Sequence, residues 1–188
     1  VFLIWGVTRI ALDHNREWTL WRGGMFAVSV FGCDKLVAKY EADNDDFSKI
    51  MAQALGDRVV EAFAEYVHRE MRLKLWAYAK DEDMSTDDML KVKYAGIRPA
   101  PGYPSQPDHT EKRLMWELLQ AEEKAGIKLS ESLSMMPASS VSALVFAHEK
   151  SEYFSVGHID KDQVADYATR KGMEVPEVEK WLAPILKY

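Results

Sequence analysis

The most chemically suggestive residues of this chain lie in one proline-rich stretch, GIRPAPGYPSQPDHTEK, at positions 96–112. Arg98 carries a planar guanidinium that matches a carboxylate, and Tyr103 offers a ring for stacking and a hydroxyl for hydrogen bonding. Prolines stand at positions 99, 101, 104 and 107. Each proline fixes its own φ and holds the residue before it in extended geometry, so much of this loop is rigid before any ligand arrives.

The residues alone leave three interpretations of this loop open. The first is a preorganised cradle for a small ligand, with Arg98 as anion anchor and Gly102 allowing close approach to the backbone. The second is a rigid structural crossover in which Arg98 belongs to an internal ion pair. The third is a polyproline segment that binds an aromatic groove on a partner protein.

The sequence lacks the motifs of most other catalytic and metal sites. Its 5 histidines include no pair four residues apart, and no His-Glu-x-x-His motif or cysteine cluster occurs. The acidic run at 43–46 is not followed by the glycine and glutamate of a calcium-binding loop, so we interpret it as a helix cap. Nucleophile-elbow and nucleotide-binding glycine motifs are also lacking. We expect His109 to be a solvent-exposed residue at a helix N-terminus.

The composition indicates one globular domain outside the membrane. The chain has 188 residues, of which 47% are hydrophobic, enough for one core. The formal net charge of −6 disfavours binding to nucleic acid. Cys33 has no partner for an internal disulfide, and no apolar run reaches the roughly 20 residues that a membrane span needs. We therefore expect a cytoplasmic protein without nucleic-acid or membrane partners.

Periodicity and capping residues predict the elements before the loop. Residues 25–32 indicate a buried strand, and the capping oxygens at 43–46 precede a long helix that runs to about Trp76. We expect an apolar stripe to form the buried face of this helix. The stripe consists of Phe47, Ile50, Met51, Ala54, Leu55, Val59, Ala62, Phe63, Tyr66, Val67 and Met71.

Two further helices are predicted on either side of the loop. Ser85 suits the N-cap of a short helix over 85–93, and Asp108 has capping-box spacing to Glu111 for a helix that runs to about Lys124. The inward residues of this second helix are expected to be Leu114, Met115, Leu118 and Leu119, and Gly126 suits its end.

The C-terminal third is predicted to hold a hairpin and two helices. Residues 139–148 and 152–159 indicate an antiparallel hairpin around a short connection. Asp160, with Gln163 three residues on, predicts a helix that ends at Gly172, and Pro176 suits the first turn of a last helix. Because strands and helices do not alternate regularly, the fold class predicted is α+β. Residues 1–23 show no clear period and stay unassigned.

Three long stretches resemble one known family. The loop at 96–112 resembles the S-adenosylmethionine-binding loop in the activation domain of cobalamin-dependent methionine synthases. Residues 45–78 resemble that domain's long helix, and residues 131–188 resemble its C-terminal segment. The resemblance identifies residues 24–188 as a partial activation domain. It implies one C-shaped α+β unit with a bent antiparallel sheet and long flanking helices.

The resemblance implies a role in methionine biosynthesis. Enzymes of this family are methyltransferases that move a methyl group from methyltetrahydrofolate to homocysteine through cobalamin. Their activation domain binds S-adenosylmethionine, which supplies the methyl group when oxidised cob(II)alamin is reduced and remethylated. The implied partners are the enzyme's cobalamin-binding module and an electron donor, flavodoxin or methionine synthase reductase.

We do not expect this chain alone to turn over, because the cobalamin, folate and homocysteine modules lie outside it. An alternative is a truncated, non-catalytic relative that acts as a docking surface for a flavodoxin-like reductase. Basic residues at 68–74 and 170–172 would supply the face for that acidic partner.

The resemblance also implies which residues contact S-adenosylmethionine. They are Arg98, Ala100, Gly102, Tyr103, Glu61, Tyr153 and Phe154. In this arrangement Arg98 binds the ligand's carboxylate, Tyr103 assists it, and the backbone near Ala100 and Gly102 meets the ligand. Phe154 stands where the family has a second tyrosine, so it supplies a ring without a hydroxyl. The family's aspartate for the ligand's ammonium has no counterpart in residues 24–188, and we expect weaker binding for that reason.

Overall fold

Two strands from distant parts of the sequence form the centre of the molecule. A computed structural model describes residues 10–11 and 22–188 of the chain. Strand β2 (Arg22–Ser29) pairs antiparallel with β5 (Ser140–Phe146), from Gly23 opposite Phe146 to Ser29 opposite Ser140. Strand β1 (Ile10–Ala11) extends this sheet beyond β2, and β3 (Lys128–Leu129) with β4 (Met135–Met136) forms a separate two-stranded sheet. The strand predicted at 25–32 is present, but it begins and ends three residues earlier.

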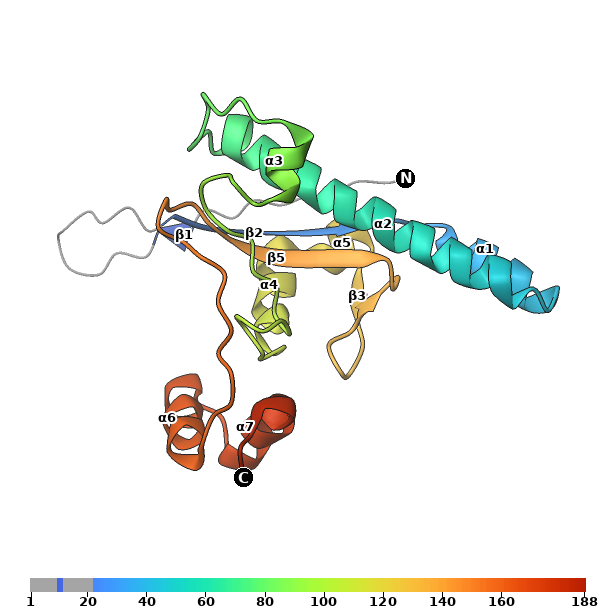
Figure 1. Ribbon diagram of the computed structural model, residues 1–188. Helices are drawn as coiled ribbons and strands as arrows, with labels where there is room; N and C mark the ends of the chain where they lie inside the picture. Colours follow the sequence, from blue (N-terminus) through green and yellow to red (C-terminus); the bar gives the residue numbers. More distant parts are fainter. Residues whose placement is uncertain (1–9, 12–21) are drawn as a thin grey trace.

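Helices cover both faces of this sheet (Figure 1). Helix α2 (Asp46–Glu70) lies on one face, with α1 (Cys33–Ala42) packed against it beyond the end of the strands, and α4 (Glu111–Leu119) and α5 (Ala121–Ala125) lie on the other face. Side chains of β2 alternate between two cores, as a strand with both faces buried requires. Phe26 and Val28 pack in the cluster with α2, whereas Met25 and Ala27 pack in the cluster with α4. The mixed, antiparallel arrangement confirms the α+β fold class.

Helix α2 begins where its acidic cap predicts, because the Asp45 side chain accepts a hydrogen bond from the Ser48 amide at 3.0 Å. The prediction of its buried face was largely wrong, since only Val67 and Met71 of the predicted stripe are buried. Eight members of the apolar stripe are exposed, namely Phe47, Ile50, Met51, Ala54, Leu55, Val59, Ala62 and Tyr66. The buried residues of α2 are Gly56, Val60, Ala64, Val67 and His68. Small residues let the helix approach the strands closely, and a Cβ on Gly56 would lie 2.6 Å from the Ser139 Oγ.

Helix α2 continues as a π-helical segment, Met71–Leu75, and the chain then reaches α3 (Thr86–Leu90). The Ser85 hydroxyl accepts from the Asp88 amide at 3.2 Å, which confirms the predicted cap. After the loop, α4 and α5 are separated at Gln120, which has a φ of 51°. The inward residues predicted there are partly wrong, because Met115 and Leu119 are buried but Leu114 and Leu118 are exposed.

The predicted hairpin at 139–148 and 152–159 does not form. Residues 151–158 are irregular, and those from 152 to 158 are exposed. Strand β5 has no edge for them, because β2 occupies one edge and the start of the loop occupies the other. On that second edge, backbone hydrogen bonds join Ile97 with Phe146 and run from the Leu144 amide to Pro99. Residues 147–158 therefore lead from the sheet to the C-terminal helices.

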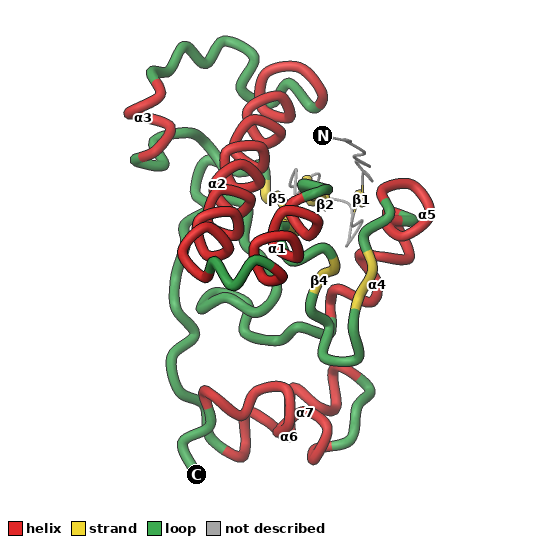
Figure 2. The backbone as a smooth tube through the Cα atoms, turned by 90° about the vertical axis from the view of Figure 1, so that its right-hand side faces the viewer, coloured by secondary structure: helices red, strands yellow, loops and turns green. Residues whose placement is uncertain are grey.

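The chain ends in a pair of helices that lies apart from the sheet in Figure 2, and its buried residues form a small core of their own. The two helices are α6 (Lys161–Lys171) and α7 (Val175–Leu182), followed by the 3-10 turn η2 (Ala183–Ile185). The Gln163 side chain accepts from the Asp160 amide at 3.0 Å, and Gly172 ends α6, as predicted. Pro176 lies in the first turn of α7. Within the part of the chain that is described, no helix is long and apolar enough to cross a membrane.

Candidate functional site

Arg98 lies between two residues, Ile97 and Pro99, whose backbone pairs with strand β5. The Ile97 amide donates to the Phe146 carbonyl at 3.1 Å, and the Leu144 amide donates to the Pro99 carbonyl at 2.9 Å. These bonds fix the backbone on both sides of Arg98. The sheet edge therefore positions this residue, and the prolines that follow keep the next residues rigid.

Three side chains surround the Arg98 guanidinium. Its Nη2 forms an ion pair with the Glu65 Oε2 at 2.7 Å. Its Nη1 donates to the Tyr94 hydroxyl at 2.9 Å and contacts the His68 Nδ1 at 3.2 Å. The Arg98 side chain is still 22% exposed. Arg98 thus belongs to an internal ion pair, as the second interpretation of the loop expected, and it also remains open to solvent; the ligand cradle stays a prediction.

His68 is fully buried and neutral. Burial, together with the charges of Arg72 and Arg98, lowers the pKa of His68 to about 2. Because its Nδ1 faces the donor on Arg98, the proton of the neutral ring belongs on Nε2, which lies 3.1 Å from the Tyr78 hydroxyl. Burial also raises the pKa of Tyr94 to about 12, so its hydroxyl stays protonated and accepts from Arg98 through a lone pair.

A second arginine, Arg72, packs against Tyr94 on the buried side of this network. Arg72 is fully buried and forms a fork of hydrogen bonds to Glu82, with its Nε 2.9 Å from Oε2 and its Nη2 3.0 Å from Oε1. Its guanidinium lies 4.0 Å from the centre of the Tyr94 ring, and that ring meets His68 edge-on. Tyr94 is therefore held on one side while it accepts from Arg98 on the other.

Glu61 lies away from this network. It is exposed and pairs with Arg58 at 2.8 Å along the surface of α2. The helix carboxylate that reaches Arg98 is Glu65, one turn further on. Sequence reasoning missed Glu65, although spacings of four residues put both glutamates near one line along the helix. The contact of Glu61 with a ligand stays a prediction.

The middle of the loop is a set of tight turns. The Tyr103 amide donates to the Ala100 carbonyl at 3.2 Å, and the Gly102 amide donates to the Gln106 carbonyl at 2.7 Å. Gly102 has a φ of +97°, and a Cβ there would lie 2.1 Å from the His109 ring. The close approach expected at this glycine is therefore made by His109. Tyr103 itself is 66% exposed.

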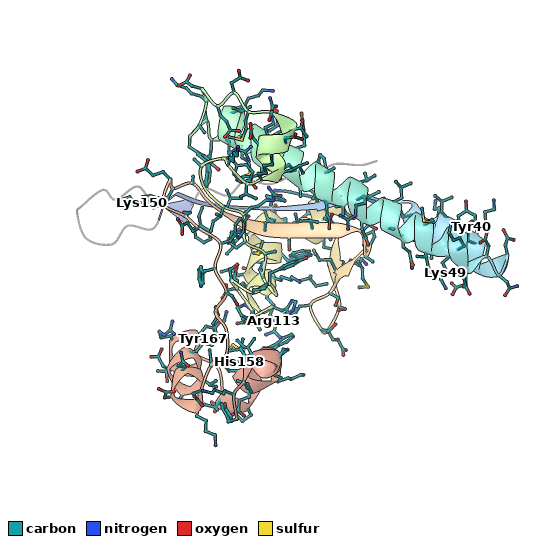
Figure 3. All side chains as sticks on the ribbon, in the orientation of Figure 1. Tyr40, Lys49, Arg113, Lys150, His158 and Tyr167 are labelled. Atoms are coloured by element: carbon teal, nitrogen blue, oxygen red, sulfur yellow. The ribbon has the colours of Figure 1, made fainter. Side chains whose placement is uncertain are left out.

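The predictions for the residues after the loop need correction. His109 is half-buried over Gly102 and contacts the Lys112 Nζ through its Nδ1 at 3.1 Å, so it is not simply solvent-exposed. Asp108 is not the N-cap of α4, which is Thr110. Asp108 instead accepts hydrogen bonds from the Thr110 amide at 2.7 Å and the Tyr167 hydroxyl at 2.6 Å. It thus ties the loop to α6, and Figure 3 shows Tyr167 on that helix.

The two aromatic residues of the 147–158 segment occupy different surroundings. The Tyr153 hydroxyl accepts from the Arg98 amide at 2.9 Å, so Tyr153 joins the site. Phe154 is 63% exposed. The irregular segment, rather than a strand, brings Tyr153 to the loop.

A cavity of about 370 Å³ lies on the C-terminal side of the loop. Tyr103, Pro104 and His109 line it from the loop, and His158 and Trp181 line it from the C-terminal segment. Figure 3 places His158 where the linking segment reaches the helix pair. Among residues 10–11 and 22–188, no group of three or more His, Cys, Asp or Glu side chains is arranged to hold a metal ion.

The basic stretches considered as a docking face are largely paired or buried. Arg72 and His68 are fully buried, and Arg69 and Lys74 both pair with Glu70. Lys171 pairs with Asp108 and Glu111. These residues do not form an unpaired basic face, so the alternative of a docking-only protein is not favoured.

Comparison with known proteins assigns the chain to a family. A family model described as "Vitamin B12 dependent methionine synthase, activation domain" matches residues 17–172. The chain belongs to this family. It is also similar to a solved structure titled "Crystal Structure of the MetH Reactivation Domain bound to AdoHcy", with 51% sequence identity and a TM-score of 0.85. That match covers 89% of this chain and 52% of the other, so this chain spans about half the length of that activation-domain structure.

Proposed function

We propose that this chain binds S-adenosylmethionine as part of the activation domain of a cytoplasmic, vitamin B12-dependent methionine synthase. The bound ligand would donate the methyl group that restores oxidised cobalamin to its active form. The observation that carries this proposal is the Arg98 guanidinium, which is fixed by three side chains and still 22% exposed at the start of a rigid loop.

The chemistry of Arg98 suits the amino-acid end of this ligand. A guanidinium can bind both oxygens of a carboxylate, and a side chain already held in place loses less entropy on binding. The similar solved structure is bound to AdoHcy, which shares that amino-acid end and lacks only the transferable methyl group. The seven implied contacts remain part of the proposal, with Arg98, Tyr103 and Tyr153 already gathered at the loop.

The role of this chain in the reaction would be to bind and orient. Reduced cobalamin, held by its own module, would supply the nucleophile for the ligand's methyl group, and S-adenosylhomocysteine would be the product left on this chain. Arg98 would hold the carboxylate far from the sulfonium, while the loop backbone near Ala100 and Gly102 would fix the rest of the ligand. Positioning of this kind supports transfer because it replaces a chance encounter by a fixed geometry.

Within a full enzyme, the partners would be the cobalamin-binding module and an electron donor of the flavodoxin or methionine synthase reductase type. The electron donor is needed because the oxidised cobalamin must be reduced before it accepts a methyl group. The family assignment supports these partners.

Calorimetric titration with S-adenosylmethionine tests the proposal. We expect saturable binding by the wild-type chain and a loss of roughly 30-fold or more in Arg98→Ala, because truncating one partner of a buried, hydrogen-bonded charge pair costs about 2–5 kcal/mol. Arg98→Lys keeps the charge but not the planar fork and should also bind weakly.

Arg170→Ala is the matched control for this titration. Arg170 pairs with Asp166 on the surface of α6 and should leave the affinity unchanged. A folded wild-type chain that does not bind S-adenosylmethionine, or equal affinity of wild type and Arg98→Ala, would contradict the proposal.

A further inference from the structure

The His109 ring packs directly against the tightest turn of the proline-rich loop. A Cβ added at Gly102 would lie 2.5 Å from the His109 Nε2 and 2.6 Å from its Nδ1, so only a glycine leaves room for the ring. The same turn is closed by the hydrogen bond from the Gly102 amide to the Gln106 carbonyl at 2.7 Å. Because the ring fills the space that a side chain would need, the position of the ring and the shape of the turn depend on each other.

A buried lysine holds this ring in place. Lys112 lies three residues further along, in the first turn of α4, and is only 6% exposed. Its Nζ donates to the Leu133 carbonyl at 3.1 Å and lies 3.1 Å from the His109 Nδ1. An ammonium group has hydrogens to donate and no lone pair with which to accept. The Nδ1 atom therefore accepts from Lys112, and the ring is neutral with its proton on Nε2.

The other charged groups near His109 do not offset the charge of Lys112. The ionisable groups around the ring are Asp108 and Tyr103 on the loop, Lys112 on α4 and His158 across the cavity. Asp108 favours a protonated ring, but its oxygens already accept from Thr110 and Tyr167, and Lys171 pairs with it. Burial and the charge of Lys112 outweigh Asp108 and lower the pKa of His109 from its ordinary value of 6.5. The ring is therefore neutral at pH 7.

Protonation of His109 would break this arrangement. The new Nδ1–H would point at the Lys112 ammonium, so two donors and two positive charges would face each other at the 3.1 Å separation of these atoms. Lys112 is buried and bonded to the Leu133 carbonyl, whereas His109 is half-buried and lines the cavity of about 370 Å³. The ring is therefore the partner that moves, and it leaves the space over Gly102.

We infer that His109 is a positioning residue for the loop that binds S-adenosylmethionine: its neutral ring, held by Lys112, supports the turn at Gly102, and a proton on the ring releases that turn. This inference rests on the proposed function and deepens it, because it names what keeps the backbone near Ala100 and Gly102 in shape for the ligand. His109 acts through Gly102 and not through contact with the ligand, so its effect on binding follows the pH.

Calorimetric titration with S-adenosylmethionine at pH 7 and pH 5 tests this inference. In the wild-type chain the affinity should fall at the lower pH by roughly threefold or more, and by at most about tenfold for each pH unit, because a single proton on His109 opposes binding. His109→Gln takes up no proton and should lose this fall. His158→Gln removes the histidine across the cavity and should keep it. The ligand's own ionisation is the same in every titration and cancels when the proteins are compared.

NMR of the free chain separates this inference from the proposed function. As the pH falls, the Gly102 amide signal should shift with the same midpoint as the His109 ring, and this shift should vanish in His109→Gln. Lys112→Met removes the opposing charge and should raise the midpoint of His109. Saturating S-adenosylmethionine should lower that midpoint in wild type, because the coupling between the proton and the ligand is reciprocal.

A free chain that shows the coupled shifts but does not bind S-adenosylmethionine would contradict the proposed function alone. A Gly102 signal that does not follow the His109 midpoint would overturn the positioning role. So would an affinity of the wild-type chain that is equal at both pH values, or a fall in affinity that persists in His109→Gln.

Discussion

At the scale of single residues, Arg98 combines an internal ion pair with a surface that faces solvent. The sequence singled out Arg98 and the stiffness of its loop, because both depend on residue types that are next to one another in the chain. It did not predict Glu65, His68 and Tyr94, because their approach to Arg98 depends on how α2 lies against the sheet edge. The stretch of the site that is local in sequence was predictable, and the part that is assembled by packing was not.

His68 makes the stability of the protein depend on pH. Its folded pKa of about 2 lies below the ordinary value of about 6.5, so between these values the unfolded chain binds a proton that the folded chain does not. The contribution of the neutral His68 ring to the free energy of unfolding is therefore fully present above pH 6.5, and it decreases as the pH falls toward the pKa of His68 in the folded protein. We expect the free energy of unfolding to decrease by about 1 kcal/mol more between pH 7 and pH 5.5 in wild type than in His68→Gln.

Urea denaturation at the two pH values measures this difference. Burial also lowers the pKa of His109, but that contribution is present in both proteins and cancels. His158→Gln removes an exposed histidine and should keep the wild-type pH dependence. An equal pH dependence in wild type and His68→Gln would show that His68 is not the buried neutral group described above.

At the scale of elements, α2 shows the limit of reading a helix from periodicity. The stripe from Phe47 to Tyr66 has helical spacing, and a helix is present, but the opposite side faces the sheet. Spacing reveals that apolar residues share a face. It does not reveal which face a distant strand covers, and here the small residues Gly56 and Ala64 permit the close approach. The predicted hairpin does not form for a related reason, because β2 and the start of the loop pair with the two edges of β5.

Two methionines of this region test the corrected orientation. Both belong to the stripe that was expected to be buried, but Met71 is fully buried in the cluster with β2 and β5, whereas Met51 is 53% exposed. Met71→Ala should lower the free energy of unfolding by about 2–5 kcal/mol, because it removes buried methylenes and leaves a cavity. Met51→Ala should change it by less than about 0.5 kcal/mol. Urea denaturation would contradict the orientation if the two variants were equally destabilised.

At the scale of the whole molecule, the C-terminal helix pair is attached to the rest of the chain through a few polar contacts. Asp108 in the loop accepts from Tyr167 and pairs with Lys171, both on α6, and Lys171 also contacts Glu111 at the start of α4. Burial alone would raise the pKa of Asp108, but the hydrogen bonds from Thr110 and Tyr167 and the charge of Lys171 together lower it. Asp108 therefore stays ionised and able to hold α6.

Tyr167→Phe should loosen this attachment without unfolding the sheet. Loss of a hydrogen bond to a charged group is worth about 1.5–3 kcal/mol, so amides of α6 should exchange with solvent roughly 10- to 100-fold faster. Amides of β2 and β5 should be unaffected. Tyr188→Phe is the matched control, because that hydroxyl bonds Glu179 within the helix pair itself. Hydrogen exchange read by mass spectrometry would refute the attachment if α6 were equally protected in Tyr167→Phe and wild type.

The most direct test of the function is a structure of this chain with S-adenosylmethionine bound. We predict that the ligand's carboxylate lies about 3 Å from the Arg98 Nε and Nη2, a normal hydrogen-bond distance, with the rest of the ligand along the loop backbone near Gly102. A ligand bound with its carboxylate away from Arg98, or no bound ligand at saturating concentration, would contradict the assignment of this loop as the binding site.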